Sequence, residues 1–215
     1  PAAERLFGYS PAELEGENAF EYFHPDDRER VSKAFIEMIE RSDPVTERVE
    51  YRFEDADGSW VWVETVGSNE TETPIDGYVL TTRDISHRKE HERRLEALHG
   101  TTYELLAAES REEIAEIGVE AARDIIGLDV NDCNLYEADR DVLVPTSSTS
   151  EVGDLIGSPP TFSDGDSIAW RAFEEGEAQA IDDIRTDPDV YNPETPIRSE
   201  LHLPLDEHGI LIAGS

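Results

Sequence analysis

Residues 47–62, with the sequence ERVEYRFEDADGSWVW, decide the fold of the first half of the chain. Within them Val49, Tyr51 and Phe53 alternate with charged residues, which is the period of a strand that buries one face. The Asp57-Gly58 pair then predicts a tight turn, and a segment rich in tryptophan and valine returns after it. This stretch therefore predicts a β-hairpin.

The segments on either side of this hairpin extend it into a domain. Residues 28–41 place apolar residues at helical spacing, which predicts an amphipathic helix. Its buried face is expected to hold Val31, Phe35, Met38 and Ile39. Residues 77–85 predict a third strand after the hairpin. Short helices followed by three antiparallel strands are typical of an α+β domain.

Four motifs in the first half occur in the order found in PAS domains. They are LFGYSPAEL at residues 6–14, FHPDDR at residues 23–28, DGSW at residues 57–60 and DIS at residues 84–86. Residues 1–86 therefore resemble a PAS domain with its PAC-type C-terminal part. The resemblance implies a sheet whose concave face can enclose a small ligand. It also implies that two further strands precede residue 1.

Residues 87–108 are expected to form a helical linker between two domains. An apolar stripe with coiled-coil spacing runs along it for about two heptads and is broken at Gly100. The stripe consists of Leu95, Leu98, Thr102 and Leu105. A solvated connecting helix explains this pattern equally well, but the similarity to PAS-containing signalling proteins favours a parallel homodimer that relays a signal. The residues assigned to the relay are Asp84, Ile85, Leu95 and Leu98.

The second half, residues 109–215, predicts another α+β domain. Ser110 and Glu113 have the spacing of a capping box at the start of a helix. The buried face of that helix is expected to hold Ile114, Ile117, Ala121 and Ile125. Strands are predicted at residues 130–137, 179–184, 199–205 and 209–213, and a short helix at residues 167–175.

Three motifs in this half resemble those of a GAF domain. They are GDSIAW at residues 165–170, IDD at residues 181–183 and RSELHLPL at residues 198–205. The resemblance implies a second central antiparallel sheet flanked by helices, again with a face that can enclose a small molecule. The last strands and the closing helix of the family would follow residue 215. We therefore expect the chain to be a fragment of a longer protein.

The charge of the chain is strongly negative. The formal net charge is −33, from 51 acidic and 18 basic residues among 215. The carboxylates run along the whole length between apolar positions, so a disordered acidic tail does not account for them. A surface for cations or basic partners is one interpretation, but a high-salt cytoplasm, where repulsion is screened, accounts for the charge best. In its scarcity of lysine, the composition of the chain resembles that of haloarchaeal proteins. Direct binding to nucleic acid is not expected, because phosphate contacts need basic patches.

The residue types needed for catalysis do not come together in the sequence, and no catalytic or metal site is predicted. Cys133 is the only cysteine, so an internal disulfide is excluded, and we expect a small core residue there. His87 and His91 are spaced four apart but lack a third ligand. No apolar run is long enough to span a membrane, and we expect a cytoplasmic segment without enzymatic activity.

The family resemblance also bears on cofactors, and it gives no support for flavin, haem or bilin. A flavin-binding PAS domain would carry its reactive cysteine where Ala19 stands. A haem-binding one would need a histidine within residues 28–41, and none is present. The residues around Cys133 do not match a bilin attachment site. The identity of any ligand is unknown.

The side chains considered as ligand contacts are aromatic. In the first domain the candidates are Phe35, Tyr51, Phe53 and Trp62, and in the second they are Trp170, Phe173 and Tyr191. For each of them we favour an ordinary core position over a ligand contact.

These features together predict a sensory input and signal-relay module of a signal-transduction protein. The favoured parent is a haloarchaeal PAS/GAF sensor histidine kinase of a two-component system. One alternative is a PAS/GAF transcriptional regulator with a C-terminal helix-turn-helix. The other is a ligand-free dimerisation scaffold.

Overall fold

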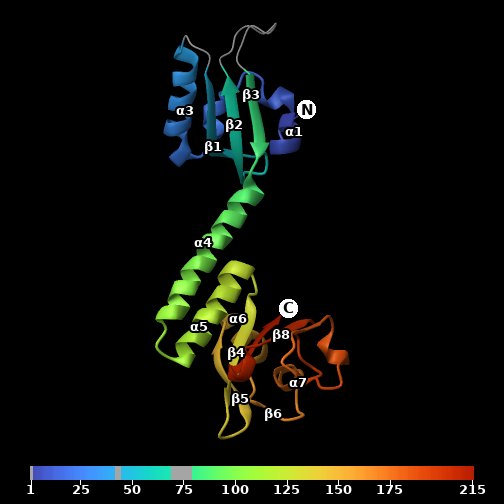
Figure 1. Ribbon diagram of the computed structural model, residues 1–215. Coiled ribbons are helices and arrows are strands. Elements are labelled where there is room, and N and C mark those ends of the chain that lie inside the picture. Colours follow the sequence, from blue (N-terminus) through green and yellow to red (C-terminus); the bar gives the residue numbers. More distant parts are fainter. Residues whose placement is uncertain (1, 42–44, 69–78) are drawn as a thin grey trace. The chain divides into compact units, whose positions relative to one another are not determined.

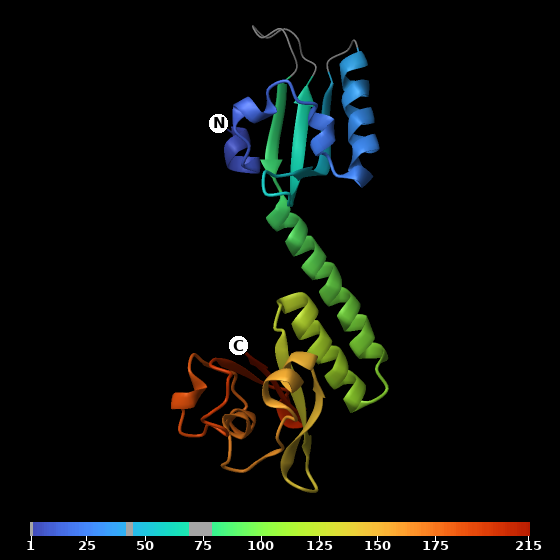
Figure 2. The ribbon, with the colours of Figure 1, turned by 180° about the vertical axis from the view of Figure 1, so that it is seen from behind.

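The computed structural model describes residues 2–41, 45–68 and 79–215, and it divides the chain into two compact units (Figures 1 and 2). The first unit is Pro1–Arg93 and the second is Arg94–Ser215. Helix α4 (Ser86–Ala107) contains the boundary between them. Each unit has an antiparallel sheet flanked by helices, so the predicted two-domain α+β class is confirmed.

The first unit is built on a three-stranded antiparallel sheet in the order β1-β2-β3. Its strands are β1 (Thr46–Glu54), β2 (Trp60–Ser68) and β3 (Val79–Asp84). Its helices are α1 (Ala2–Phe7), α2 (Pro11–Leu14), the 3-10 helix η1 (Ala19–Tyr22) and α3 (Pro25–Glu40). The predicted hairpin is confirmed, since Phe53 lies opposite Val61 across β1 and β2. Of the predicted third strand, residues 77–78 lie outside the described residues.

The pleat of this sheet gives its two faces different surroundings. Tyr51, Phe53 and Val63 are buried on the inner face, where the helices of the unit pack. Arg52 and Trp62 occupy the positions between them and are paired across the strands. Because successive side chains of a strand alternate, Arg52 and Trp62 lie on the opposite, outer face.

Helix α3 buries a narrower face than its sequence predicts. Val31 and Met38 are buried and Phe35 is partly buried, but Ile39 is exposed. At about 100° per residue Met38 is almost in line with Val31, whereas Ile39 is turned about 80° away. The prediction that Ile39 is buried was therefore wrong.

The second unit is built on a six-stranded antiparallel sheet in the order β6-β5-β4-β9-β8-β7. Its strands are β4 (Val130–Glu137), β5 (Val142–Ser148), β6 (Phe162–Ser163), β7 (Gln179–Ile181), β8 (Glu200–Pro204) and β9 (Gly209–Gly214). Its helices, besides the end of α4, are α5 (Arg111–Ala121), the π-helix η2 (Ala122–Ile126), α6 (Ser150–Ile156), α7 (Ile168–Glu175) and the 3-10 helices η3 (Ile184–Thr186) and η4 (Asp206–His208). Strand β5 and helix α6 had no predicted counterpart. Pro145 and the polar residues after it hide the alternation of β5.

Helix α5 faces the sheet with its small residues. Ala115 and Val119 are buried and pack against Cys133 of β4, whereas Ile114 is exposed. The prediction that Ile114 is buried was therefore wrong, whereas Ile117, Ala121 and Ile125 are partly buried. Small side chains at these positions allow the helix to lie close to the strands, a preference that hydrophobic spacing alone does not reveal. The core position predicted for Cys133 is confirmed.

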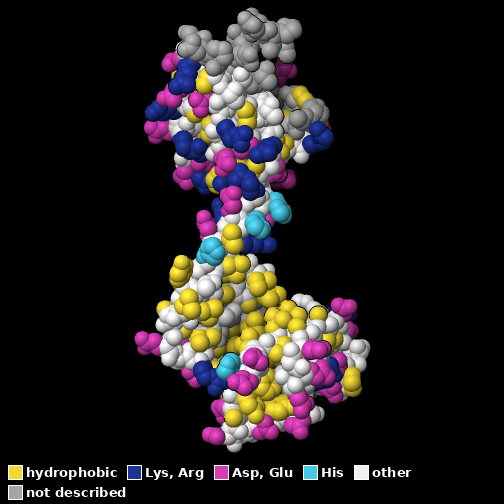
Figure 3. Space-filling model, viewed as in Figure 1, with side chains coloured by type: hydrophobic (Ala, Val, Ile, Leu, Met, Phe, Trp, Pro, Cys, Tyr) yellow, Lys and Arg dark blue, Asp and Glu magenta, His cyan; other side chains and the backbone are white. Residues whose placement is uncertain are grey.

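Helix α4 continues through Gly100, where the coiled-coil pattern is broken. None of its residues is buried. Its C-terminal half lies beside α5 in both views (Figures 1 and 2), and hydrophobic side chains gather over this region in Figure 3. The exposed apolar residues of the two helices are Leu95, Leu98, Tyr103, Leu105, Leu106 and Ile114.

Candidate ligand-binding sites

The second unit contains a cavity of about 430 Å³ whose floor is the sheet. Strand β9 pairs with β4 on one side and with β8 on the other. Ile212 is therefore opposite both Asp132 and His202, and these three residues form one row across the sheet. The next row on the same face contains Glu200 beside Gly214. Three polar side chains from strands far apart in the sequence thus share the floor of one cavity.

The walls of this cavity come from helices and loops. They include Val152 and Ile156 of α6, residues 158–160, Phe162, the start of α7, and residues 190–192. Ser167 caps α7 by accepting a hydrogen bond from the Trp170 backbone N–H at 3.0 Å. Arg171 of the same helix forms ion pairs with Asp187 and Asp189, which hold the start of the loop that forms the outer wall. Capping and ion pairing therefore fix the walls locally.

Asp132 is the most perturbed acid in the cavity. Its side chain is only 9% exposed, and Asn134 Nδ2 donates a hydrogen bond to Asp132 Oδ2. Burial raises the pKa of Asp132 to about 7; the Asn134 hydrogen bond opposes that rise and the charge of Glu200 adds to it. The Asp132 carboxyl group can therefore change its protonation state near neutral pH.

Glu200 and His202 form a pair on β8. His202 Nε2 and Glu200 Oε2 are 2.9 Å apart, and His202 is 2% exposed. His202 Nδ1 has no hydrogen-bond partner among the described residues. A neutral imidazole that donates from Nε2 to Glu200 leaves Nδ1 as an acceptor. The pair therefore orients the Glu200 carboxylate on the cavity floor.

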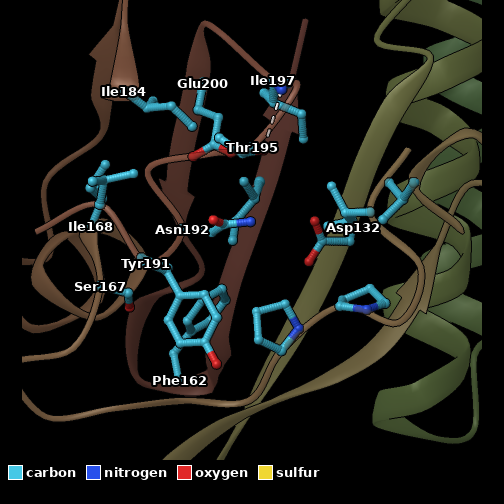
Figure 4. A pocket seen from close by; sticks show the side chains of 18 of the residues that line it. Asp132, Phe162, Ser167, Ile168, Ile184, Tyr191, Asn192, Thr195, Ile197 and Glu200 are labelled. Atoms are coloured by element: carbon cyan, nitrogen blue, oxygen red, sulfur yellow. Dashed lines mark hydrogen bonds between the residues drawn. The ribbon is translucent and has the colours of Figure 1, made fainter. Parts of the chain in front are cut away.

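Only one of the three aromatic residues proposed as ligand contacts in this domain lies in the cavity. Tyr191 lines the cavity, and Figure 4 shows its ring beside Phe162. Trp170 and Phe173 do not line it and pack instead against the core that contains Leu143. The core position favoured for both is what the structure shows, because the first residues of α7 face the cavity and the bulky ones turn into the core.

The polar residues of the cavity floor do not stand out in the sequence. Their signal was a charged or ionisable residue at an alternate position of a predicted strand, as at Asp132 and His202. In a chain with 51 acidic residues, that signal does not stand out from the background.

Cys133 lies on the other face of β4 from Asp132. Burial raises the pKa of its thiol to about 11, and the charge of Asp132 adds to the rise. The thiol therefore stays protonated at neutral pH, which disfavours nucleophilic chemistry.

The first unit contains a smaller cavity of about 240 Å³ between the inner face of its sheet and α3. Phe35, Tyr51 and Phe53, three of the proposed contacts, line it. Its polar part contains Glu47 and a chain of hydroxyl groups, in which Tyr51 Oη lies 2.9 Å from Thr65 Oγ1 and Thr65 Oγ1 lies 2.9 Å from Thr82 Oγ1. The cavity is otherwise mostly apolar and suits a small molecule with few polar groups.

Trp62, the fourth proposed contact, does not line this cavity. It lies on the outer face, where Arg52 Cζ and Lys89 Nζ each stand 5.3 Å from the centre of its ring. This expectation is corrected by the register, because Trp62 is opposite Arg52, whereas the inner face carries Tyr51 and Phe53.

Of the residues assigned to the relay, Asp84 and Ile85 directly precede α4, and Leu95 and Leu98 lie within it. Asp84 Oδ1 accepts a hydrogen bond from the Ser86 backbone N–H at 2.7 Å, and Ile85 is buried. Ile85 N–H donates to the carbonyl of Trp62 at 2.9 Å, so the end of β3 is fastened to β2. Leu95 and Leu98 are 48% and 47% exposed. The four residues therefore divide into an anchored pair and an exposed pair.

Two further properties concern only the part of the chain that the structure describes. No group of three or more His, Cys, Asp or Glu side chains there is arranged to hold a metal ion. No helix among the described residues has both the length and the apolar character to cross a membrane.

Comparison with known families gives one match for each half of the chain. A PAS fold model matches residues 1–73, and a GAF domain model matches residues 108–215. No curated protein matches the chain. The family models match the two halves in the order that the sequence motifs predict.

Several solved structures are also similar to this chain. The GAF domain of a phosphoenolpyruvate-protein phosphotransferase (ptsP) from Coxiella burnetii is 19% identical over 57% of this chain and 77% of that chain, with a TM-score of 0.47. A sensory box histidine kinase/response regulator from Burkholderia thailandensis E264 is 32% identical over 50% of this chain and 79% of that chain, with a TM-score of 0.37. The PAS-B domain of Drosophila melanogaster Cycle, solved with bound ethylene glycol, is 23% identical over 39% of this chain and 84% of that chain, with a TM-score of 0.33.

Proposed function

The chain belongs to the GAF domain family and carries a PAS-fold domain before its GAF domain, and from this premise we propose that it is the input and relay region of a signal-transduction protein. The observation that carries the proposal is the cavity of about 430 Å³ on the sheet of the GAF domain. Its volume is in the range of small-molecule pockets, and its apolar walls surround a few polar groups. We propose that a small molecule bound there is the stimulus.

The GAF cavity has a wall that can respond to a ligand. Tyr191 and Asn192 belong to the loop between η3 and β8. Arg171 of α7 holds the start of this loop by its ion pair with Asp187. A ligand that contacts this loop in one conformation more strongly than in another shifts the population of the two. The ligand would therefore act through the order of this loop.

The relay would run through α4. Its first turn is fastened to the PAS sheet by Asp84 and Ile85, and the side chains of Arg88 and Lys89 pair with Glu50 of β1. A shift of the sheet therefore reaches the helix through both backbone and side-chain contacts. We propose that exposed Leu95 and Leu98 form a homodimer seam that carries this shift onward.

The finer identity of the protein is also part of the proposal. The favoured parent is a sensor histidine kinase from a halophilic archaeon, with this segment in a high-salt cytoplasm; the acidic composition supports the salt adaptation. A transcriptional regulator with a helix-turn-helix is compatible with the same input domains. We propose no catalytic role for the segment itself, since the buried Cys133 thiol is held protonated away from the Glu200–His202 pair.

Two tryptophan substitutions on α6 test the ligand-receiving role. Ile156 lines the cavity and Leu155 does not, although both are exposed. Native mass spectrometry of the purified chain should detect a bound small molecule in the wild type and in Leu155→Trp, and Ile156→Trp should lose it. An empty wild-type chain after purification from its own cells would favour the ligand-free scaffold instead.

A further inference from the structure

We infer that the GAF cavity takes a small organic cation, an amine with an apolar body, whose charged end lies at the carboxylates of Asp132 and Glu200. The inference rests on the proposed function and specifies the class of ligand. The cavity, the free carboxylate oxygens and the lack of lysine or arginine among the described lining residues together support it.

The ionisable side chains that line the cavity are all acidic groups or histidine. They are Asp132 on β4, Glu200 and His202 on β8, and Tyr191 on the outer loop. No lysine or arginine is among the described lining residues. Among the described lining residues, the floor therefore carries two carboxyl groups, and its one basic side chain is the imidazole of His202, which pairs with Glu200.

In each of these two carboxylates, one oxygen has a hydrogen-bond partner among the described residues and the other has none. Asp132 Oδ2 accepts from Asn134, and Glu200 Oε2 pairs with His202. The second oxygen of each group has no hydrogen-bond partner among the described residues. Figure 4 shows both carboxylates pointing into the cavity. The free oxygen of Asp132, a residue that is nine-tenths buried, faces the cavity, where a donor on a bound ligand can reach it.

The charge of the ligand follows from the cost of burying these acids. An ammonium group donates charge-assisted hydrogen bonds to carboxylates, which are about twice as strong as neutral ones. A carboxylate or phosphate ligand would add a third negative charge in a poorly solvated space and be repelled. The geometry therefore selects cations over anions.

The apolar body of the ligand follows from the walls. Ile168, Ile184 and Ile197 line the cavity, and Pro159, Pro160 and Phe162 continue the apolar surface. Burying hydrocarbon against such walls removes apolar surface from water and favours binding. A compact polyamine with charge at both ends would place one charge against this surface, so a monoamine with an aliphatic or aromatic body fits better.

Binding of a cation also changes the protonation of Asp132. Burial, opposed by Asn134 and reinforced by Glu200, raises the pKa of Asp132 to about 7, and an adjacent ammonium lowers it again. The groups that face Asp132 are Asn134 on its own strand and Glu200 and His202 from β8, while α6 contributes only Val152 and Ile156. Amine affinity should therefore rise as pH increases through about 7.

Three probes of the same shape and different charge test the inference. Titration calorimetry on the whole chain in molar KCl would compare phenethylamine, phenethyl alcohol and phenylacetate. We expect phenethylamine to bind at least about tenfold more tightly than the alcohol, and phenylacetate not to bind. The substitutions Asp132→Asn and Glu200→Gln should each weaken phenethylamine binding about tenfold or more, and the former should remove the pH dependence.

Asp154→Asn provides the matched control for charge. It removes one carboxylate from the exposed surface of α6, outside the cavity, and should leave binding unchanged. Equal binding of the alcohol, or full affinity in both cavity variants, would overturn the inference. Tighter binding of phenylacetate would overturn the ligand class but leave the sensory cavity standing. Binding of none of the three, with no small molecule retained by the purified chain, would overturn the class and the proposed function together.

Discussion

Asp132 is the residue whose protonation connects the fold of the second unit to pH. Its ordinary pKa is 3.8, and burial raises it to about 7 in the folded chain. The folded state therefore holds this proton more tightly than the unfolded state does. Its contribution to stability is fully present below pH 3.8 and is lost as pH rises through about 7.

The first prediction concerns Asp132→Asn. At about 1.4 kcal/mol per pKa unit, the raised pKa corresponds to a loss of about 4 kcal/mol between acid and alkaline pH. The asparagine variant cannot ionise, so its free energy of unfolding should fall less than that of the wild type between about pH 5 and pH 8. Urea unfolding followed by tryptophan fluorescence measures the free energy of unfolding of the wild type and of the variant. Parallel pH profiles of the two proteins would contradict the raised pKa.

Gly209, at the start of β9, is a position where any side chain is excluded. Its φ is +152°, and a Cβ atom there would collide with the Asn134 carbonyl oxygen and lie 3.0 Å from Leu135 Cα. Both neighbours are backbone atoms of β4, which cannot move without breaking the pairing of the two strands.

The second prediction compares two glycine-to-alanine substitutions. Gly209→Ala should destabilise the second unit by about 3 kcal/mol or more, because it strains backbone against backbone. Gly118→Ala lies within α5 with nothing within 4 Å of the added Cβ, and should stabilise by about 0.5–1 kcal/mol. Chemical denaturation of both variants gives the comparison. Similar free energies of unfolding for the two would show that the approach of β9 to β4 is looser than the structure has it.

At the scale of elements, α4 differs from the other long helices in burying none of its residues. An isolated helix of polar character is marginal in water, and the stability of most helices comes from packing an apolar face. The first turn is capped by Asp84 and anchored by Ile85, but Leu95 and Leu98 remain about half exposed. A second copy of the helix is the partner that would cover them in the proposed homodimer.

The third prediction is that Leu95→Glu together with Leu98→Glu shifts the chain from dimer to monomer. The two introduced carboxylates of one helix would face the same carboxylates of the second copy. Charge repulsion would then replace the apolar contact between the leucines. Light scattering in molar salt measures the mass. The matched control is Glu96→Gln, an exposed position between the two leucines. A wild-type chain that is already monomeric would leave α4 as a solvated connecting helix.

The outcome for the other elements shows where hydrophobic spacing predicts well. The β1–β2 hairpin and strand β4 were predicted within a residue or two, because strong alternation and turn residues are local signals. For α5 the prediction was wrong at Ile114, since the choice of Ala115 and Val119 as the buried residues depends on how closely the sheet lies.

At the scale of the whole molecule, the net charge of −33 governs stability. Like charges repel in the compact state, and salt shortens the range of that repulsion to about 3 Å at 1 M. The ion pairs on the outer face of the PAS sheet are partly exposed and contribute little by comparison.

The fourth prediction is that the melting temperature rises as KCl increases from about 0.2 M to about 2 M, because the repulsion among carboxylates is screened. Differential scanning calorimetry with an uncharged solute at equal osmolality separates screening from solute exclusion. A melting temperature that stays level or falls with salt would remove the support for a high-salt cytoplasm.

The sequence by itself determined the identity and order of the two domains, most of their elements, and three of the aromatic residues that line the PAS cavity. These follow from periodicity and turn chemistry, which are properties of neighbouring residues. It did not determine which side chains meet. Trp62 left the first cavity because of the register with Arg52, and Asp132 and His202 met because β9 pairs with both β4 and β8. Convergence of residues about 70 positions apart depends on sheet pairing, and only the tertiary structure decides it.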